Sequence, residues 1–321
     1  MKKTLLTLSI AAVFAVGASA AEFKAGTYTA KAPGIHGDVT VTVTFTKDKI
    51  ADVKVTHSET PGIGSKAAEL LPGRIVERQS PQVDGVTGAT ITSTAIRTAV
   101  ADTVKQAGAD PAALVPLAVK KQAKNETVDT DVVVVGGGGA GMSATIRTRM
   151  NGLNVVLVEK MPFIGGAASI SGGQVVAQGS KLQKAFGVTD DSVESMVKDF
   201  QANGHNLNDL SKLTLYAKNV GPTIDWLHDQ VGVKFIPNDL PFLAEYSHRR
   251  ALEFQGGAGT MAQHLREVIG SNGAKVLFNT RVEKLIVEDG KVTGVEAVDG
   301  NTGTKYTIRA KKTLLTTGGY G

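Results

Sequence analysis

The chain has 321 residues, of which 42% are hydrophobic and 20% charged, the balance of a globular protein long enough for two domains. Its formal net charge of +5 is mild, and no stripe of basic and aromatic residues indicates nucleic-acid binding. It contains no cysteine, which excludes c-type haem attachment and cysteine-ligated zinc or iron–sulfur centres. If this protein moves electrons, an organic cofactor must carry them.

Residues 1–20 have the organisation of a secretory signal peptide. Lys2 and Lys3 precede a largely apolar stretch, residues 5–16, and Ala18-Ser19-Ala20 forms a small-x-small cleavage site. We expect cleavage after Ala20 and a periplasmic or otherwise exported protein. The alternative, an uncleaved anchor, is weakened because the apolar stretch is too short to cross a bilayer as a stable helix.

Residues 21–107 are expected to form a first, small α+β domain. Residues 40–45 alternate as a half-buried strand does, and residues 50–55 follow as a second strand after a turn. The next segment, residues 57–64, reads HSETPGIG and is punctuated by proline and glycine. It is either a plain hairpin loop or a backbone that packs flat against a planar ligand.

A second loop, DGVTGAT over residues 84–90, combines two glycines with hydroxyl side chains and runs into a helical pattern over residues 91–104. Helix N-termini attract anions through their free N–H groups and the helix dipole. This pattern indicates an anion site, and the alternative is a Ser/Thr-rich helix cap without a ligand.

Together, HSETPGIG and DGVTGAT resemble the paired motifs of the FMN-binding domain found in redox-driven ion-pump subunits and in some exported flavoprotein reductases. The resemblance implies that a flavin transferase attaches FMN covalently to Thr90 through a phosphoester. We expect His57 to be a solvated or structural residue. The other residues expected around the cofactor are Thr87, Gly88, Ala89, Glu59 and Thr60.

Residues 108–128 carry two prolines and a lysine pair and are expected to link the first domain to a second, residues 129–321. There, a β-branched run at residues 130–135 leads into Gly136, Gly138 and Gly141 in the G-x-G-x-x-G spacing. A helix is expected over residues 139–150 and a strand over residues 154–158. Glu159 follows at 23 residues from the first glycine, close to the roughly 20 typical of a ribose-binding carboxylate.

These elements predict a Rossmann-like dinucleotide site, in which the three glycines permit the turn, the approach of pyrophosphate and close helix–strand packing. The dinucleotide is either NAD or FAD on this evidence alone.

A second glycine-rich segment occupies residues 165–173, and a late strand runs into Thr-Gly-Gly. With these features, residues 130–321 resemble the fumarate reductase and ketosteroid dehydrogenase group of FAD enzymes. The resemblance implies non-covalent FAD. Ala167 and Ala168 depart from it, because many members have Asn or Thr there. The residues expected to contact FAD are Gly136, Gly138, Gly139, Ala140, Gly141, Glu159, Lys160, Gly165, Gly166, Ala167, Ala168, Ser171, Gly172, Gly173, Thr317 and Gly318.

The remaining pattern predicts α/β structure, a Rossmann-like FAD-binding domain preceded by the FMN-binding domain. Between the Rossmann halves we expect helices at residues 191–203 and at residues 210–227, the second broken near Gly221-Pro222. A helix at residues 260–269 and strands at residues 275–278, 282–288, 292–298 and 313–317 complete the expected order.

Catalytic residues are harder to predict. His248 and Arg249 are weak candidates for holding a carboxylate, since the 248–250 cluster His-Arg-Arg could equally brace FAD phosphate or lie at the surface. The other histidines have no metal-ligand spacing, so no metal is expected. By resemblance, the substrate-clamping residues and the proton-delivering Arg follow the Thr-Gly-Gly strand. We therefore expect the sequence to stop before them, with an incomplete FAD domain and little turnover by itself.

The predicted function is a flavoprotein oxidoreductase that passes electrons from covalent FMN to FAD and on to the C=C bond of a small unsaturated carboxylate of the fumarate, urocanate or acrylate type. An exported or membrane-bound donor would supply the electrons. The alternative is a two-flavin electron carrier without its own substrate site.

Overall fold

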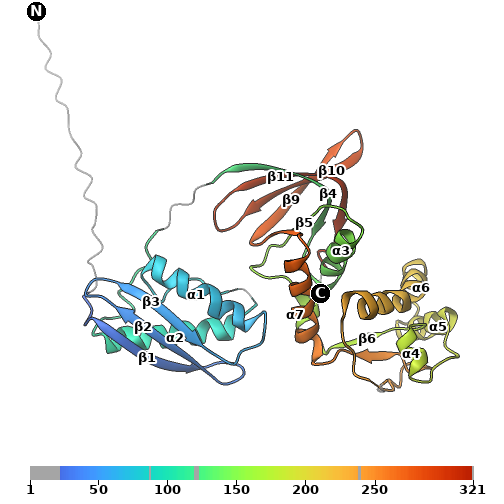
Figure 1. Ribbon diagram of the computed structural model, residues 1–321, viewed down its shortest axis with the longest axis horizontal. Helices are drawn as coiled ribbons and strands as arrows, with labels where there is room; N and C mark the ends of the chain where they lie inside the picture. Colours follow the sequence, from blue (N-terminus) through green and yellow to red (C-terminus); the bar gives the residue numbers. More distant parts are fainter. Residues whose placement is uncertain (1–21, 87, 119–122, 238–239, 320–321) are drawn as a thin grey trace, which may run out of the picture.

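The computed structural model describes residues 22–86, 88–118, 123–237 and 240–319, which form two domains joined by a linker (Figure 1). The predicted signal peptide lies outside the described residues. The first domain is an antiparallel sheet in the order β1-β2-β3 with two helices packed against it. Its elements are β1 (Gly26–Pro33), β2 (Asp38–Phe45), β3 (Ile50–Thr56), α1 (Gly64–Arg78) and α2 (Thr90–Gln106).

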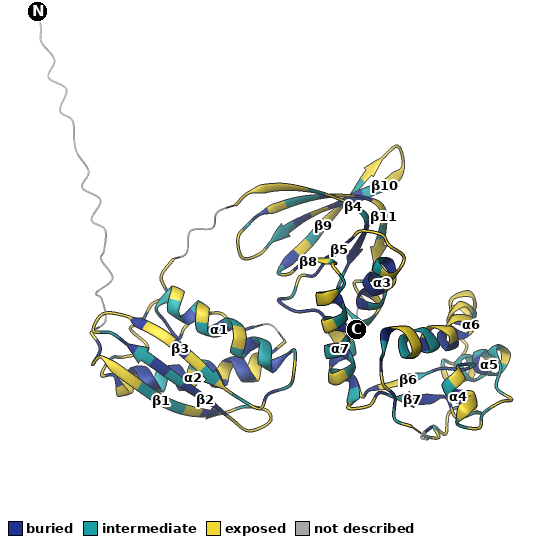
Figure 2. Cartoon of the chain, in the orientation of Figure 1, coloured by how far each residue is buried: buried dark blue, intermediate teal, exposed yellow. Residues whose placement is uncertain are grey.

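The core of the first domain follows from strict alternation along β2. Val39, Val41 and Val43 are fully buried, while the residues between them are not. The helices complete this core with the buried side chains of Leu71 and Ile96, and Figure 2 shows their inner faces as buried. The structure adds β1 and α1 to the predicted elements. The Pro72-Gly73 pair inside α1 has the composition of a turn, yet the helix continues through it.

The second domain is built on a six-stranded sheet in the order β8-β5-β4-β11-β10-β9. The strands β8, β5, β4 and β11 are parallel, and β10 and β9 extend the sheet as antiparallel neighbours. Their bounds are β4 (Asn125–Val135), β5 (Val155–Val158), β8 (Lys275–Leu277), β9 (Thr280–Glu288), β10 (Lys291–Asp299) and β11 (Lys305–Leu315). The strand β4 thus begins five residues before the predicted start, because β11 pairs with it from Asn125 onward.

The valine run of β4 is buried on both faces of the sheet, as its composition predicts. Val132 and Val134 face the core that includes α3 (Gly139–Met150) and α7 (Gly257–Ser271), whereas Val133 and Val135 pack on the opposite face. The predicted helix over residues 139–150 matches α3 at both ends.

A helical segment lies between the Rossmann halves, beside the two-stranded sheet of β6 (Gln174–Val176) and β7 (Ala251–Glu253) (Figure 1). It consists of α4 (Lys181–Ala185), α5 (Val193–Asn203) and α6 (Leu210–Trp226). The predicted break at Gly221-Pro222 is wrong, since α6 runs through both residues. Gly221 serves packing instead: a Cβ there would lie 2.4 Å from the backbone oxygen of Gln178.

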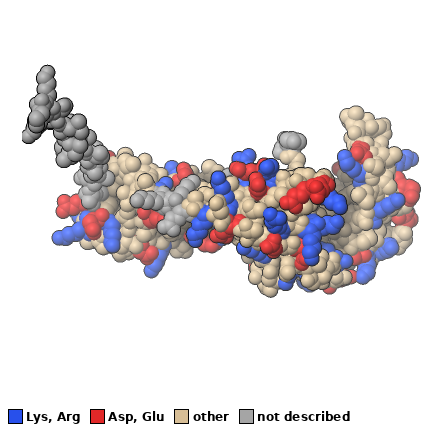
Figure 3. All heavy atoms as spheres, turned by 90° about the horizontal axis from the view of Figure 1, so that it is seen from above, with Lys and Arg blue, Asp and Glu red and all other residues tan. Residues whose placement is uncertain are grey.

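Lysine, arginine and acidic side chains are interspersed over the face shown in Figure 3. Within the described ranges, no helix has the length and apolar character needed to cross a membrane.

Candidate functional site

The glycine-rich turn between β4 and α3 is shaped by contacts that a side chain would block. Gly136 has a φ of +98°, and a Cβ there would lie 2.6 Å from the carbonyl oxygen of Thr316. A Cβ at Gly141 would lie 1.8 Å from the carbonyl oxygen of Gly136, so α3 packs on the turn only without a side chain at this position. At Gly138, by contrast, a Cβ would meet no atom within 4 Å. The backbone of Gly138 is therefore open to a ligand, beside the unpaired amides of the first turn of α3.

Glu159 directly follows the last residue of β5, beside this turn, and is 8% exposed. Its Oε2 accepts a hydrogen bond of 2.6 Å from the amide of Gly137, and its Oε1 accepts one of 2.8 Å from the amide of Met161. Each carboxylate oxygen keeps a further lone pair, so the group can still accept hydrogen bonds from ligand hydroxyls.

A cavity of about 650 Å³ opens at this edge of the sheet, a volume in the range of cofactor sites. It brings together most of the residues predicted to contact FAD. Those lining it are Gly136, Gly138, Gly139, Ala140, Glu159, Lys160, Gly166, Ala167, Ala168, Thr317 and Gly318.

Five predicted contacts lie outside the lining of this cavity: Gly141, Gly165, Ser171, Gly172 and Gly173. Gly165 donates its amide to the carbonyl oxygen of Gly137, which joins the two glycine segments. Gly173, with φ of +87°, packs against the first turn of α7 and accepts a hydrogen bond from the amide of Phe254.

Several cavity residues were not predicted, among them Gly137, Met161, Thr280, Arg281, Val282, Thr316 and Gly319. The segment of Thr280 and Arg281 reaches the cavity because the amide of Thr280 donates to the carbonyl oxygen of Glu159. No sequence motif marks residues 280–282. Gly319, by contrast, belongs to the predicted Thr-Gly-Gly segment, and Thr316 directly precedes it.

In the first domain, Thr90 is the first residue of α2 and has an exposed side chain. The preceding loop is held by hydrogen bonds from the amide of Ala89 to the carbonyl oxygen of Val86 and from the amide of Val86 to Oγ of Ser93. Gly88 permits the turn with a φ of +84°. Thr87 lies outside the described residues. A hydroxyl at a helix N-terminus, reachable from solvent, fits the predicted phosphoester anchor.

The side chains of Glu59 and Thr60 connect the HSETPGIG loop to residues 35–36 and to the first turn of α2. The buried carboxylate of Glu59 accepts hydrogen bonds from the amides of Ile35 (2.8 Å) and His36 (3.1 Å) and from the hydroxyl of Thr92 in the first turn of α2. Burial raises the pKa of Glu59, but the hydrogen bonds from Thr92, His36 and Ile35 outweigh it and leave the pKa below its ordinary value. Oγ1 of Thr60 lies 3.0 Å from Nε2 of His36.

His57 accepts a hydrogen bond of 3.1 Å at Nδ1 from the amide of Glu59. This contact gives the ring a place in the loop that agrees with the structural role expected for it.

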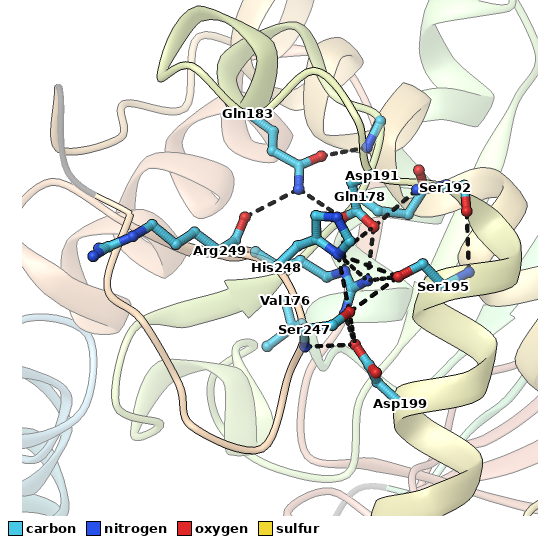
Figure 4. Close-up of polar contacts among 12 residues, drawn as sticks. Val176, Gln178, Gln183, Asp191, Ser192, Ser195, Asp199, Ser247, His248 and Arg249 are labelled. Carbon is cyan, nitrogen blue, oxygen red and sulfur yellow. Dashed lines mark hydrogen bonds and ion pairs between the residues drawn. The ribbon is translucent and has the colours of Figure 1, made fainter.

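The three residues of the 248–250 cluster lie in three different environments, and none of the three residues lines the cavity. Arg250 is fully buried and pairs with both oxygens of Asp191, at 2.7 Å each, and with Asp199 at 2.6 Å. His248 lies at the edge of this network, and Nδ1 is 3.2 Å from Oγ of Ser195. Figure 4 shows Arg249 pointing away from it.

The partners of Arg249 are the carbonyl oxygen of Leu240, at 2.7 Å, and the ring of Phe242. The network of Arg250 holds the loop before β7 on α5, which is a structural task. The catalytic role of His248 and Arg249 stays a prediction.

The two domains touch where each carries its candidate flavin site. A Cβ at Gly88 would lie 3.1 Å from the ring of Phe163 and 3.8 Å from Cε of Met161. Phe163 is 9% exposed and belongs to the core cluster of the first domain. Met161 also lines the 650 Å³ cavity, so one side chain borders both sites.

This fold and these sites define a two-domain flavoprotein. The family model of the FAD binding domain matches residues 131–321, and that of the FMN-binding domain matches residues 34–105. The chain belongs to the FAD-binding family and carries the FMN-binding domain in front of it. The predicted fold class and both flavin cofactors are thereby confirmed.

Several relatives are reductases or oxidoreductases by name. Urocanate reductase of Eggerthella lenta is 34% identical over 95% of this chain and 51% of its own length. NADH:acrylate oxidoreductase of Vibrio harveyi is 30% identical over 94% of this chain and 36% of its own. The open conformation of a flavocytochrome c3 fumarate reductase aligns with a TM-score of 0.55 at 35% identity, covering 60% of this chain and 34% of that one. The chain thus spans about half the length, or less, of these relatives.

Proposed function

We propose that this chain is the flavin-carrying part of an exported oxidoreductase that reduces the C=C bond of a small unsaturated carboxylate. The observation that carries the proposal is Met161, which lines the FAD cavity and also adjoins the DGVTGAT loop. Two flavin sites that share a side chain suit electron transfer between them. Export is supported by Lys2, Lys3 and the apolar stretch that follows, and by the cleavage site ending at Ala20.

In this proposal a flavin transferase joins FMN to Thr90 through a phosphoester, and an exported or membrane-bound donor delivers electrons. When bound, the flavins supply the electron and hydride chemistry. The chain's own residues would hold them: the first turn of α2 would bind the FMN phosphate, the turn at Gly138 would admit the FAD pyrophosphate, and Glu159 would accept hydrogen bonds from the adenosine ribose. The substrate class follows from the names of the relatives, urocanate, acrylate and fumarate reductases.

An anaerobic assay tests this function. The chain is co-expressed with a flavin transferase, its flavins are reduced with a viologen, and fumarate, urocanate or acrylate is added while flavin reoxidation is followed. Reoxidation by one of these acids supports the reductase. Reoxidation by ferricyanide alone, with all three acids inert, favours the second candidate, a two-flavin electron carrier.

Arg249→Ala decides whether that residue belongs to a substrate site. Because its guanidinium contacts Leu240 and Phe242 and not the cavity, we expect the substitution to leave reoxidation unchanged. Loss of the reaction in this variant would place carboxylate binding at residues 248–250.

A further inference from the structure

Arg266, on α7 of the FAD domain, is a half-buried cation whose partners are all neutral. Its Nη1 donates to the carbonyl oxygen of Ile164 at 3.0 Å, and its Nε and Nη2 donate to Oε1 of Gln263 at 3.2 and 3.0 Å. Among the residues that the structure describes, no carboxylate oxygen lies within 4 Å of its nitrogens. Burial lowers the pKa of Arg266, and Glu267 opposes this effect. A buried charge without an anionic partner is costly.

The guanidinium is directed at the first flavin loop of the other domain. A Cβ at Gly62, within HSETPGIG, would lie 1.9 Å from Nη2 of Arg266. Two residues along the loop, a Cβ at Gly64 would lie 2.9 Å from Oγ1 of Thr92. Thr92 belongs to the first turn of α2, which begins at Thr90.

A second contact encloses the same helix end from the loop before it. Phe163 packs against Gly88, two residues before Thr90: a Cβ placed on Gly88 would lie 3.1 Å from Cζ of Phe163. The next residue, Ile164, supplies the carbonyl oxygen that anchors Arg266. The FAD domain therefore contacts both motif loops of the FMN domain: Phe163 contacts DGVTGAT, and Arg266 contacts HSETPGIG.

We propose that Arg266 is a positioning residue for the FMN on Thr90, to which it supplies a positive charge from the FAD domain. An FMN phosphodiester carries one negative charge, and a reduced flavin ring carries another when its N1 position is deprotonated. Arg266 favours both, and so docks the FMN domain on the FAD domain and stabilises reduced FMN. This inference rests on the proposed attachment of FMN to Thr90.

The first test measures FMN redox equilibrium by spectroelectrochemistry, with the FAD-only variant Thr90→Ala subtracted. At a fixed potential, Arg266→Gln should lower the ratio of reduced to oxidised FMN by about tenfold, the order expected when one partly buried positive charge is removed from the vicinity of an anionic cofactor. Arg266→Lys should retain most of the wild-type ratio. The matched control is Arg147→Gln, which removes an exposed arginine on α3 that stacks on Trp226, and it should change nothing.

A second test needs no change at Arg266 and decides the matter if Arg266→Gln fails to fold. Arginines of the FMN-loaded chain and of Thr90→Ala are modified with phenylglyoxal, and the peptides are quantified by mass spectrometry. Arg266 should react several-fold more slowly when FMN is present, with Arg147 equal in both proteins.

Two results would overturn this inference and leave the proposed function standing. One is attached FMN with the same ratio of reduced to oxidised flavin in Arg266→Gln as in the wild type. The other is equal labelling of Arg266 in the FMN-loaded chain and in Thr90→Ala. Absence of any FMN on the chain would instead defeat the attachment at Thr90, and this inference with it.

Discussion

The two candidate flavin sites both lie at the N-terminus of a helix, yet they differ in what surrounds it. At α3, glycines leave the backbone accessible, and a cavity of about 650 Å³ forms between five segments of the chain. At α2, the first residue is a threonine with an exposed hydroxyl, and the buried polar groups nearby bond to one another. A ligand held only by non-covalent contacts needs an enclosing surface, whereas one covalent bond allows an open site. In the proposed function, the hydroxyl of Thr90 retains FMN through one covalent bond, and the cavity retains FAD through many non-covalent contacts.

The largest expected effect comes from removing that hydroxyl. Thr90→Ala should abolish FMN attachment completely, since no oxygen remains to form the phosphoester, while Thr90→Ser should keep it. Intact mass after co-expression with a flavin transferase measures this directly. Thr94→Ala, one turn along the same exposed side of α2, is the control and should carry FMN. Full FMN mass on Thr90→Ala would show that the two sites do not differ in the way described.

Two glycines of the FAD site separate folding from binding. Gly141→Ala should destabilise the second domain by about 3 kcal/mol or more, because its Cβ would lie 1.8 Å from a backbone oxygen. Gly138→Ala should fold within about 0.5 kcal/mol of the parent but bind FAD about tenfold more weakly, since its methyl occupies the open approach to the turn. Denaturant unfolding of the apoprotein and FAD titration distinguish them. Equal effects of both substitutions on folding would contradict these assignments.

The two buried glutamates provide a second contrast. Glu59→Ala should cost roughly 2–3 kcal/mol of folding stability, as the amides of Ile35 and His36 and the hydroxyl of Thr92 lose their acceptor. The pKa of Glu59 is lowered in the folded protein. Its stabilisation is therefore complete above the unfolded carboxyl pKa of about 4.3 and disappears as the pH falls through the lower folded value.

Hydrogen exchange in β2 as a function of pH reports this effect in the first domain. Glu59→Gln should flatten the acid limb of the profile, and an unchanged limb would argue that the carboxylate does not clamp the loops.

The smallest effect concerns the ligand rather than the fold. Glu159→Ala should weaken FAD binding by roughly 1–3 kcal/mol, the cost of losing a hydrogen-bond acceptor for the ribose. Because Glu159 also accepts the amides of Gly137 and Met161, some loss of stability accompanies it. Glu159→Gln, which preserves one acceptor, is the control and should bind FAD more tightly than the alanine variant. An FAD affinity unaltered in both would remove Glu159 from the site.

Local patterns in the sequence determined the parts of the protein that depend on short stretches of chain. Alternation predicted β2, and the valine run with its spaced glycines predicted β4, the turn and α3. The two flavin motifs placed Thr90 at a helix start and Glu159 at a strand end, because both positions are set by contacts within a few residues.

Only the tertiary structure decided what depends on residues far apart. α6 continues through Gly221-Pro222, where the backbone of Gln178 packs against Gly221. Arg250 is buried with its charge neutralised by Asp191 and Asp199, which lie more than 50 residues earlier in the chain. Met161 and Arg266 have no motif, and they reach the FMN loops only when the two domains pack together. Such long-range contacts have no periodic signature, so the border between the two flavin sites emerges from the folded chain alone.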